Sequence, residues 1–178
     1  MRKLADIDYK IIFELMKNAR MNDKQIAGKL GVAQPTVSRR RARLEKERLI
    51  NFSVIPNFED FGFEVLAFTF VHYNPSIRGQ IISDKGIQEK VSETLLKHPN
   101  IIFASSGRGL GFEGVSLSIH IDYASYIEFM KSLKADWGKF AERIESFTIS
   151  MKGDNTVRPL SFGHVVNYIE DKLLCSSV

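Results

Sequence analysis

The densest cluster of charged side chains in this 178-residue sequence is the arginine-rich run Arg39-Arg40-Arg41-Ala42-Arg43. Guanidinium groups bind phosphates and bridge O6 and N7 of guanine, and hydroxyl side chains hydrogen-bond to bases or phosphates. Two hydroxyls, Thr36 and Ser38, come just before the run. The combination is typical of a surface that reads the major groove of DNA. By itself it is equally typical of an ordinary solvated helix face, so the surrounding elements must decide between the two interpretations.

A helix over residues 34–47 would divide these side chains between two faces. At 100° per residue, Val37 and Leu44 lie together on a packing side, and Arg40 and Arg41 flank them. The opposite side carries Pro35, Thr36, Ser38, Arg39, Ala42 and Arg43. Proline is tolerated there because the N–H that it lacks has no partner in the first helical turn.

The preceding residues predict two shorter helices that would support this one. A four-residue apolar repeat predicts a helix over residues 6–19. Asn22 is placed to cap a second helix, with Gln25 three positions later, where a capping box requires it. Gly31 ends that helix because glycine accepts the left-handed conformation. The short link Val32-Ala33 then leads into the arginine-bearing helix, which completes a helix-turn-helix.

A strand is expected directly after the arginine-bearing helix. Apolar and polar residues alternate from Leu49 to Ile55, and Pro56 and Asn57 end the run. This strand would begin a wing or a hinge.

The charge of the chain is divided unevenly. Residues 1–55 hold 13 Lys and Arg against 6 Asp and Glu, a net charge of +7, whereas residues 56–178 hold 12 against 15, a net charge of −3. A basic segment beside a mildly acidic one favours a polyanionic partner for the first. Apolar residues make up 44% of the chain, yet no apolar run approaches the roughly 20 residues that a membrane helix needs. The single cysteine, Cys175, permits no internal disulfide, and we expect a cytoplasmic protein without a membrane segment.

The N-terminal residues resemble the winged helix-turn-helix of the Lrp/AsnC (feast/famine) transcriptional regulators. The resemblance is carried by Asp6 with Ile11-Ile12, Asn18-Ala19-Arg20, the run Ile26 to Ala33, Thr36 to Arg40, and Leu44-Glu45 with Leu49-Ile50. It covers the first 55 residues. One departure is Ala33, where the family usually has a serine that caps the recognition helix, and losing that cap costs about 1 kcal/mol.

The second half of the chain predicts a sheet with helices on one face. Glu64 to Tyr73 is apolar on both faces, so both faces should be covered. The further elements expected are a helix over residues 85–97, strands at 101–103 and 115–121, a helix at 123–137 and a strand at 144–151. This order, β-α-β-β-α-β, is the split βαβ arrangement. The predicted fold is therefore α+β, a winged helix-turn-helix followed by a ferredoxin-like (RAM-type) domain.

The resemblance implies that this second domain binds effectors and forms oligomers. In the family its bare sheet face is buried against a second subunit, so a homodimer or larger even oligomer is expected. The domains assigned are residues 1–55 for DNA binding, 56–63 for a hinge, 64–154 for the ferredoxin-like domain and 155–178 for a C-terminal extension. A short amphipathic helix is expected in that extension, packed either on its own subunit or in an oligomer contact.

A glycine-rich element, Gly109 to Gly114, matches the G-x-G-x-x-G pattern of dinucleotide-binding sites. That pattern must open a helix, but the alternating run Val115 to Ile121 predicts a strand, which excludes a dinucleotide site. The element is instead expected to form the loop of a long hairpin between two strands. In the resembled family the same hairpin carries a Gly-x-x-Asp element for small effectors. This chain has no such aspartate, so an amino-acid site is in doubt. Either the loop is a subunit contact, which we favour over an intact amino-acid site, or it serves a different ligand. The effector candidates are Gly107, Arg108, Gly109 and Glu113.

Enzymatic and metal-binding alternatives find little support in the sequence. The four histidines are scattered, and neither His-x-x-x-His nor Cys-x-x-Cys spacing occurs. No catalytic residue, metal or cofactor is assigned. One alternative is a tetrapyrrole enzyme like the sirohaem decarboxylases, which resemble this layout and would use His72 or His120. RNA binding is disfavoured because no cluster of stacking aromatics follows the RNP pattern.

The sequence therefore predicts a sequence-specific regulator of transcription that binds double-stranded DNA, with a small-molecule effector as a further expectation. We expect five residues in or beside the major groove: Gln34, Thr36, Ser38, Arg39 and Arg43, with Pro35 next to them. Phosphate contacts are expected from Arg40, Lys24, Asn22 and Arg20.

Overall fold

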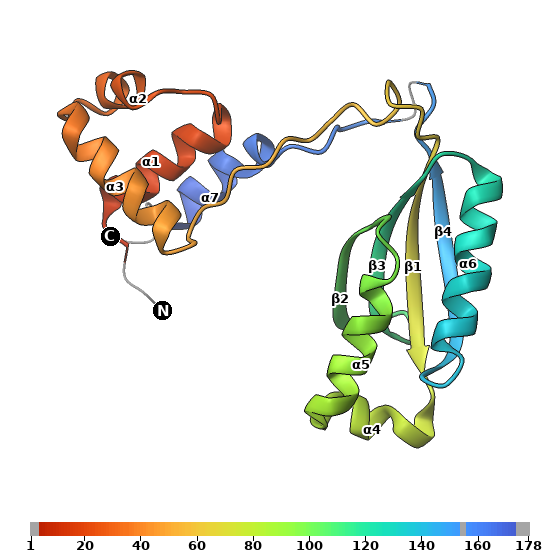
Figure 1. Cartoon of the computed structure of the whole chain (residues 1–178). Coiled ribbons are helices and arrows are strands. Elements are labelled where there is room, and N and C mark those ends of the chain that lie inside the picture. Colours follow the sequence, from red (N-terminus) through yellow and green to blue (C-terminus); the bar gives the residue numbers. More distant parts are fainter. Residues whose placement is uncertain (1–3, 154–155, 174–178) are drawn as a thin grey trace. The chain divides into compact units, whose positions relative to one another are not determined.

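The computed structural model describes residues 4–153 and 156–173, and they form two compact units (Figure 1). The chain up to Ile55 and the residues from Arg158 onward form a helical unit. Pro56 to Val157 form an α/β unit. The last segment of the chain therefore belongs to the same unit as the first.

The helical unit is built on three helices, α1 (Asp6–Lys17), α2 (Asp23–Leu30) and α3 (Gln34–Lys46). Each turns an apolar stripe toward a common core, whose buried members are Ile11, Leu15, Met21, Ile26, Ala27, Val37 and Leu44. The three predicted helices are confirmed, although α1 ends two residues before Ala19. Burial of these side chains stabilises the unit by about 25 cal/mol for each Å² of apolar surface removed from water.

The predicted ends of α2 are confirmed by reciprocal hydrogen bonds. Gln25 N–H donates to Asn22 Oδ1 and Asn22 N–H donates to Gln25 Oε1, both at 2.9 Å. Gly31 follows the helix with a φ of 66°, in the left-handed region. At α3 the N-cap residue is Ala33, and its side chain forms no capping hydrogen bond. The bond that a serine would form at this position is therefore absent.

The predicted wing strand is wrong for the described residues. Residues 49–57 contain no strand, and Val54 and Ile55 are 87% and 47% exposed. An alternating pattern makes a strand only where a neighbouring strand accepts its backbone hydrogen bonds, and none lies beside this segment. The segment is extended chain leading away from α3.

The C-terminal segment folds back onto α1 of the helical unit. It forms the 3-10 turn η1 (Phe162–Val165) and the helix α7 (Val166–Leu173), with Val166 only 1% exposed. Gly163 lies so close to α1 that a Cβ atom there would be 3.2 Å from the Met16 carbonyl oxygen. An ion pair of 3.6 Å joins Lys17 to Glu170. The predicted short helix is thus confirmed and packs within its own subunit.

The α/β unit contains a four-stranded antiparallel sheet in the order β2-β3-β1-β4, as Figure 1 shows. The strands are β1 (Val65–Tyr73), β2 (Ile101–Gly109), β3 (Phe112–His120) and β4 (Ala141–Ser150). Helices α5 (Lys85–Leu96) and α6 (Tyr123–Trp137) cover one face of the sheet. The predicted βαββαβ order is confirmed.

One helix was not predicted. No element was assigned to the sequence between Tyr73 and residue 85, but α4 (Pro75–Ser83) lies there. Asn74 caps it by accepting a hydrogen bond from Ser76 N–H at 3.1 Å, and Pro75 occupies the first turn. Both residues are favourable at a helix start, so the local signal was present.

The glycine-rich element includes the tight turn of a β-hairpin. Strands β2 and β3 run up to Gly109 and Phe112, and the two residues between them are Leu110 and Gly111. Both have positive φ values, 54° and 77°, as two-residue hairpin turns require. The expected long hairpin is therefore confirmed, but its loop has only two residues, because the other residues of the element belong to paired strands.

The sheet face away from the helices is apolar and uncovered. Cross-strand pairing aligns Phe147, Phe68, Leu117 and Phe103 in a row across the sheet. Phe147 and Phe103 are 64% and 55% exposed. No described residue of the chain covers this row.

Candidate nucleic-acid interface and ligand cavity

The outer face of α3 presents the sequence-predicted groove residues in one strip. Gln34, Pro35, Arg39 and Ala42 are exposed, and Thr36 is half-buried. Arg39 forms no hydrogen bond or ion pair with any residue in the described part of the chain. Behind this strip, Val37 and Leu44 are fully buried and fix the rotation of the helix. The predicted division of α3 is confirmed for Val37 and Leu44 on the packing side and for Pro35, Arg39 and Ala42 on the outer side. Ser38 and Arg43, predicted on the outer side, bond to carboxylates of α2 and α1.

Two other arginines of α3 are held by one buried carboxylate. Asp8 of α1 is 1% exposed, and its Oδ1 accepts a hydrogen bond from Arg40 Nη1 at 2.9 Å. Its Oδ2 accepts from Arg43 Nη2 at 2.7 Å and from the Ala5 N–H at 3.0 Å. Asp8 therefore ties α1 to α3 at the residues expected to contact DNA.

The pKa of Asp8 reflects this arrangement. Burial by itself raises the pKa, because it disfavours the charged form. The hydrogen bonds from Arg40 and Ala5 and the positive charges of Arg40 and Arg43 outweigh that effect. The net result is a pKa below the ordinary value, so Asp8 is ionised at neutral pH.

A second carboxylate, Asp23 at the start of α2, binds the other flank of α3. It accepts a hydrogen bond from Ser38 Oγ at 2.6 Å and lies 3.2 Å from Arg41 Nη1. The Arg41 guanidinium also lies 4.9 Å from the centre of the Phe52 ring and bonds to Glu45. Ser38 and Arg41 are thus occupied within the unit, which leaves Arg39 as the unengaged arginine in the run.

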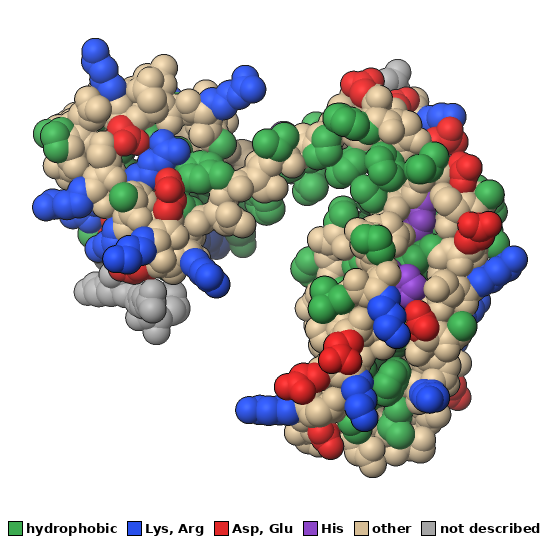
Figure 2. Space-filling model, in the orientation of Figure 1, with side chains coloured by type: hydrophobic (Ala, Val, Ile, Leu, Met, Phe, Trp, Pro, Cys, Tyr) green, Lys and Arg blue, Asp and Glu red, His purple; other side chains and the backbone are tan. Residues whose placement is uncertain are grey.

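The residues predicted to meet phosphate surround α2. Arg20, Asn22 and Lys24 are all exposed. Lys24 has no ion pair with the described residues, whereas the Asn22 side chain is committed to the cap of α2. Figure 2 shows Lys and Arg side chains projecting from the visible face of the helical unit.

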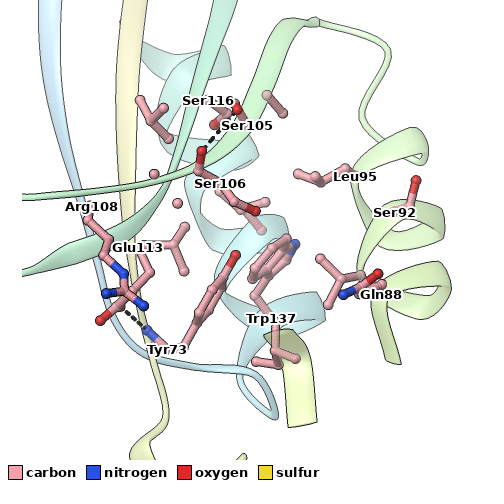
Figure 3. Close-up of a pocket in the computed structure, with 18 residues that line it drawn as sticks. Tyr73, Gln88, Ser92, Leu95, Ser105, Ser106, Arg108, Glu113, Ser116 and Trp137 are labelled. Carbon is pink, nitrogen blue, oxygen red and sulfur yellow. Dashed lines mark hydrogen bonds between the residues drawn. The ribbon is translucent and has the colours of Figure 1, made fainter. Parts of the chain in front are cut away.

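A cavity of about 760 Å³ lies in the α/β unit, between α5 and strands β1, β2 and β3 (Figure 3). Three of the four effector candidates line it, namely Gly107, Arg108 and Glu113. Gly109 does not line it and pairs with Phe112 at the hairpin turn.

Glu113 is a buried carboxylate with one hydrogen bond, from a backbone N–H, and two basic side chains close by. Its Oε1 lies 3.1 Å from Arg78 Nη2, and its Oε2 lies 3.1 Å from His72 Nδ1. The Tyr73 N–H donates to Oε2 at 3.0 Å. These contacts position the carboxylate at one end of the cavity.

The two histidines proposed for a tetrapyrrole site are engaged elsewhere. His120 is 4% exposed, its Nε2 lies 2.9 Å from Ser118 Oγ, and Tyr126 packs edge-on against its ring. Burial lowers the pKa of His120 and keeps it neutral. His72 lies between Glu113 and Glu142. Within residues 4–153 and 156–173, no group of three His, Cys, Asp or Glu side chains is arranged to hold a metal, and no helix is long and apolar enough to span a bilayer.

Several residues that shape these sites were not singled out from the sequence. Asp8 and Asp23 looked like ordinary acidic residues at helix starts, a position that the helix dipole favours. Their contacts with α3 join residues 15 to 35 positions apart. Trp137, expected only as part of an apolar stripe, lines the cavity. The tertiary fold alone reveals these roles.

Comparison with known sequences places the helical unit in a defined class. Residues 4–45 match the model of the AsnC-type helix-turn-helix domain. The chain is 30% identical over 133 residues to the HTH-type transcriptional regulator Ptr1 of Methanocaldococcus jannaschii, covering 71% of this chain and 79% of that protein. It is 34% identical over 104 residues to an uncharacterized HTH-type transcriptional regulator of Pyrococcus furiosus, covering 57% of this chain. That match spans 64% of the relative's length, and another, from Pyrococcus horikoshii, spans 61%.

Solved structures share the whole fold at lower identity. Escherichia coli AsnC superposes with a TM-score of 0.66 at 15% identity, over 89% of this chain and 98% of that one. The Neisseria meningitidis transcriptional regulator NMB0573, solved as a complex with L-Met, superposes with a TM-score of 0.69 at 16% identity, over 92% of this chain and 99% of that one. At these identities the likeness concerns the fold.

Proposed function

Because this chain belongs to the Lrp/AsnC family, we propose that it is a sequence-specific regulator of transcription that binds double-stranded DNA in the cytoplasm. One observation carries the proposal: Arg39 stands exposed and unpaired, among the described residues, on a face of α3 whose opposite side is buried. A rigid helix that presents a free guanidinium between small residues fits the major groove, where arginine bridges guanine O6 and N7.

The remaining contacts divide between bases and phosphates. Gln34, Thr36 and Ser38 lie beside Arg39 along α3, with Pro35 next to them, and are assigned to the groove and its edges. Lys24, Arg20 and Asn22 at α2 are assigned to phosphates, where they fix the register of the protein on the duplex. Asp8 forms hydrogen bonds with both Arg40 and Arg43. These arginines therefore contact DNA only if a phosphate or a base replaces Asp8 as their partner.

We also propose that the functional form is a homodimer or larger even oligomer. The apolar row Phe147, Phe68, Leu117 and Phe103 has no cover within the described chain. Exposed aromatic rows of this kind are typical of subunit interfaces. Two-fold symmetry then predicts near-palindromic DNA sites with half-sites spaced by helical turns. A small-molecule effector acting on the α/β unit, near Gly107, Arg108, Gly109 and Glu113, is part of the same proposal.

The proposal is tested by selecting bound fragments from genomic DNA with the purified protein, followed by titration of the selected site and of random DNA. Arg39→Ala should weaken binding to the selected site by about 1–3 kcal/mol and relax its base preference. Lys131→Ala is the matched control, because it removes one exposed positive charge from the α/β unit and should leave base preference unchanged.

Two results would contradict the assignment. Fragments recovered without any shared sequence would show that the protein binds DNA through charge alone. An equal loss for selected and random DNA in Arg39→Ala would show that Arg39 meets a phosphate and not a base. The tetrapyrrole alternative gains no support, because no matching relative or structure reported above is an enzyme of that kind.

A further inference from the structure

The cavity in the α/β unit has the size and walls of a small-molecule site within a single protomer. Its volume of about 760 Å³ lies in the usual range for ligand pockets. Apolar walls come from three elements, with Val91 and Leu95 on α5, Leu133 and Trp137 on α6, and Val71 on β1. Such walls favour an apolar or aromatic body over a sugar or a nucleotide.

One wall carries a hydrogen-bond donor that lacks a partner. Trp137 is 3% exposed, and its Nε1 finds no acceptor among the described residues. In Figure 3 this nitrogen lies on the side of the indole ring nearest Leu95, another lining residue. A buried donor without a partner costs about 1–3 kcal/mol, and the π face of an aromatic ring in a bound molecule accepts weakly from such an N–H.

The charged end of the cavity favours an anion without an ammonium group. Glu113 faces Arg78, His72 and the Tyr73 N–H, so both of its oxygens are already engaged. An ammonium group would therefore find no unoccupied carboxylate there. Arg108 lines the same end, as Figure 3 shows, and forms no ion pair with the described residues. Among the described residues, Arg108 is therefore the cationic side chain at this end that has no carboxylate partner.

We propose that this cavity binds a monocarboxylic acid with an aromatic or branched apolar body and no amino group. Arg108 binds the carboxylate, because a guanidinium pairs with carboxylates through two parallel hydrogen bonds. The apolar body packs on Leu133, Leu95 and the indole of Trp137. Serine hydroxyls at Ser92 and Ser106 border the cavity and supply further donors. The inference rests on the effector site of the proposed function, whose ligand class it names, and is independent of the proposed DNA binding.

Trp137 is the only tryptophan in the chain, so its fluorescence reports directly on the cavity. The full-length protein is titrated with 3-phenylpropionate, with L-phenylalanine, which adds an ammonium, and with 3-phenylpropionamide, which lacks the charge. Calorimetry of the same samples measures binding at any site. We expect a saturable change in Trp137 emission with 3-phenylpropionate, and affinities about tenfold weaker for the other two compounds, which is the size of one charge-assisted hydrogen bond.

Three variants locate the site. Arg108→Ala should weaken 3-phenylpropionate about tenfold, since it removes the charged contact. Ser92→Phe places a ring from α5 into the cavity and should abolish binding while circular dichroism stays unchanged. Lys134→Ala removes an exposed charge of α6 that does not line the cavity and should leave the affinity unaltered.

Several outcomes would overturn the inference. Absence of saturable binding by 3-phenylpropionate would show that the cavity is not a site for such acids. Equal affinities for the acid and L-phenylalanine would show that no discrimination against the ammonium exists. Heat of binding without a change in Trp137 emission would place the ligand elsewhere. DNA binding by the same preparation is measured in a separate experiment. A protein that selects DNA but does not bind 3-phenylpropionate would contradict only the ligand proposal, and the reverse result would contradict only the proposed DNA binding.

Discussion

Replacing Asp8 by asparagine tests whether this carboxylate anchors the DNA-reading helix. Asparagine keeps the shape of the side chain and an oxygen for the Ala5 N–H. It loses the negative charge that Arg40 and Arg43 share, and its amide N–H₂ cannot accept from a guanidinium. The variant therefore removes the tie between α1 and α3 without deleting apolar packing.

The magnitude follows from the exposure of the two partners. A hydrogen bond to a charged group contributes about 1.5–3 kcal/mol when buried, and an exposed ion pair about 0.2–1 kcal/mol. The Arg40 side chain is 27% exposed and that of Arg43 is 45% exposed, whereas Asp8 is 1% exposed. Taking the lower buried figure for Arg40 and the middle of the exposed range for Arg43 gives about 2 kcal/mol. For a unit of this size that corresponds to a fall in Tm of about 10 °C.

The same contacts make this contribution depend on pH. The pKa of Asp8 is lower in the folded chain than in the unfolded one, as explained above. Its contribution is complete at neutral pH, starts to fall near the unfolded pKa of about 4, and is lost as the pH drops through the folded pKa. The stability difference between the wild type and Asp8→Asn should therefore shrink below about pH 4.

The assay is thermal unfolding of the helical unit followed by circular dichroism, with Asp6→Asn as the matched control. Asp6 lies in the same turn of α1 and is exposed, so its loss changes the net charge equally but breaks no described ion pair. In parallel, affinity for random DNA is measured at a temperature where all variants are folded. We expect Asp8→Asn to bind random DNA more tightly, because Arg40 and Arg43 become free for phosphates.

Two results would refute this reasoning. If Asp8→Asn and Asp6→Asn unfold at the same temperature, Asp8 is not an anchor. If Asp8→Asn destabilises the unit but its affinity for random DNA changes no more than that of Asp6→Asn, the carboxylate does not compete with phosphates for the two arginines.

Three further predictions follow from single contacts. Asn22→Ala should destabilise the helical unit by about 1 kcal/mol through loss of the α2 cap, while Asn22→Ser should retain most of it, and equal effects in denaturant unfolding would contradict the capping role. Lys24→Ala should weaken selected and random DNA alike and reduce the slope of log affinity against log salt by about 0.9, so an unchanged slope would remove Lys24 from the phosphate contacts. Because burial lowers the pKa of His120, the α/β unit should lose stability as the pH falls below about 6.5, whereas His120→Gln should lose less over the same range. Unfolding followed by Trp137 fluorescence measures this difference, and parallel curves would show that His120 titrates normally.

Helices and strands could be predicted where the residues that specify them lie within a few positions of one another. The cap formed by Asn22 and Gln25, the left-handed Gly31 and the apolar stripe of α6 all act over one or two turns. Short-range hydrogen bonds and side-chain periodicity are encoded directly in residue spacing, so these elements were predictable. The helix α4 was missed although its signal, Asn74 followed by Pro75, was equally local.

Features that depend on distant residues were beyond the sequence patterns. The alternation from Leu49 to Ile55 resembled a strand, but no neighbouring strand lies there to accept its hydrogen bonds. The final helix could have packed against either unit or another subunit, and only the fold places Val166 and Gly163 against α1. Nothing in the spacing of the acidic residues distinguished Asp8 from the exposed Asp6.

By itself the sequence determined which side of α3 is buried, because a 3.6-residue period fixes the faces of a helix wherever it packs. It also determined the βαββαβ order, since that order follows from successive local periodicities. Which arginine of α3 has no partner among the described residues became clear only from the packing of the helices. That choice depends on where Asp8 and Asp23 come to lie, and their distance from α3 along the chain carries no information about their distance in space.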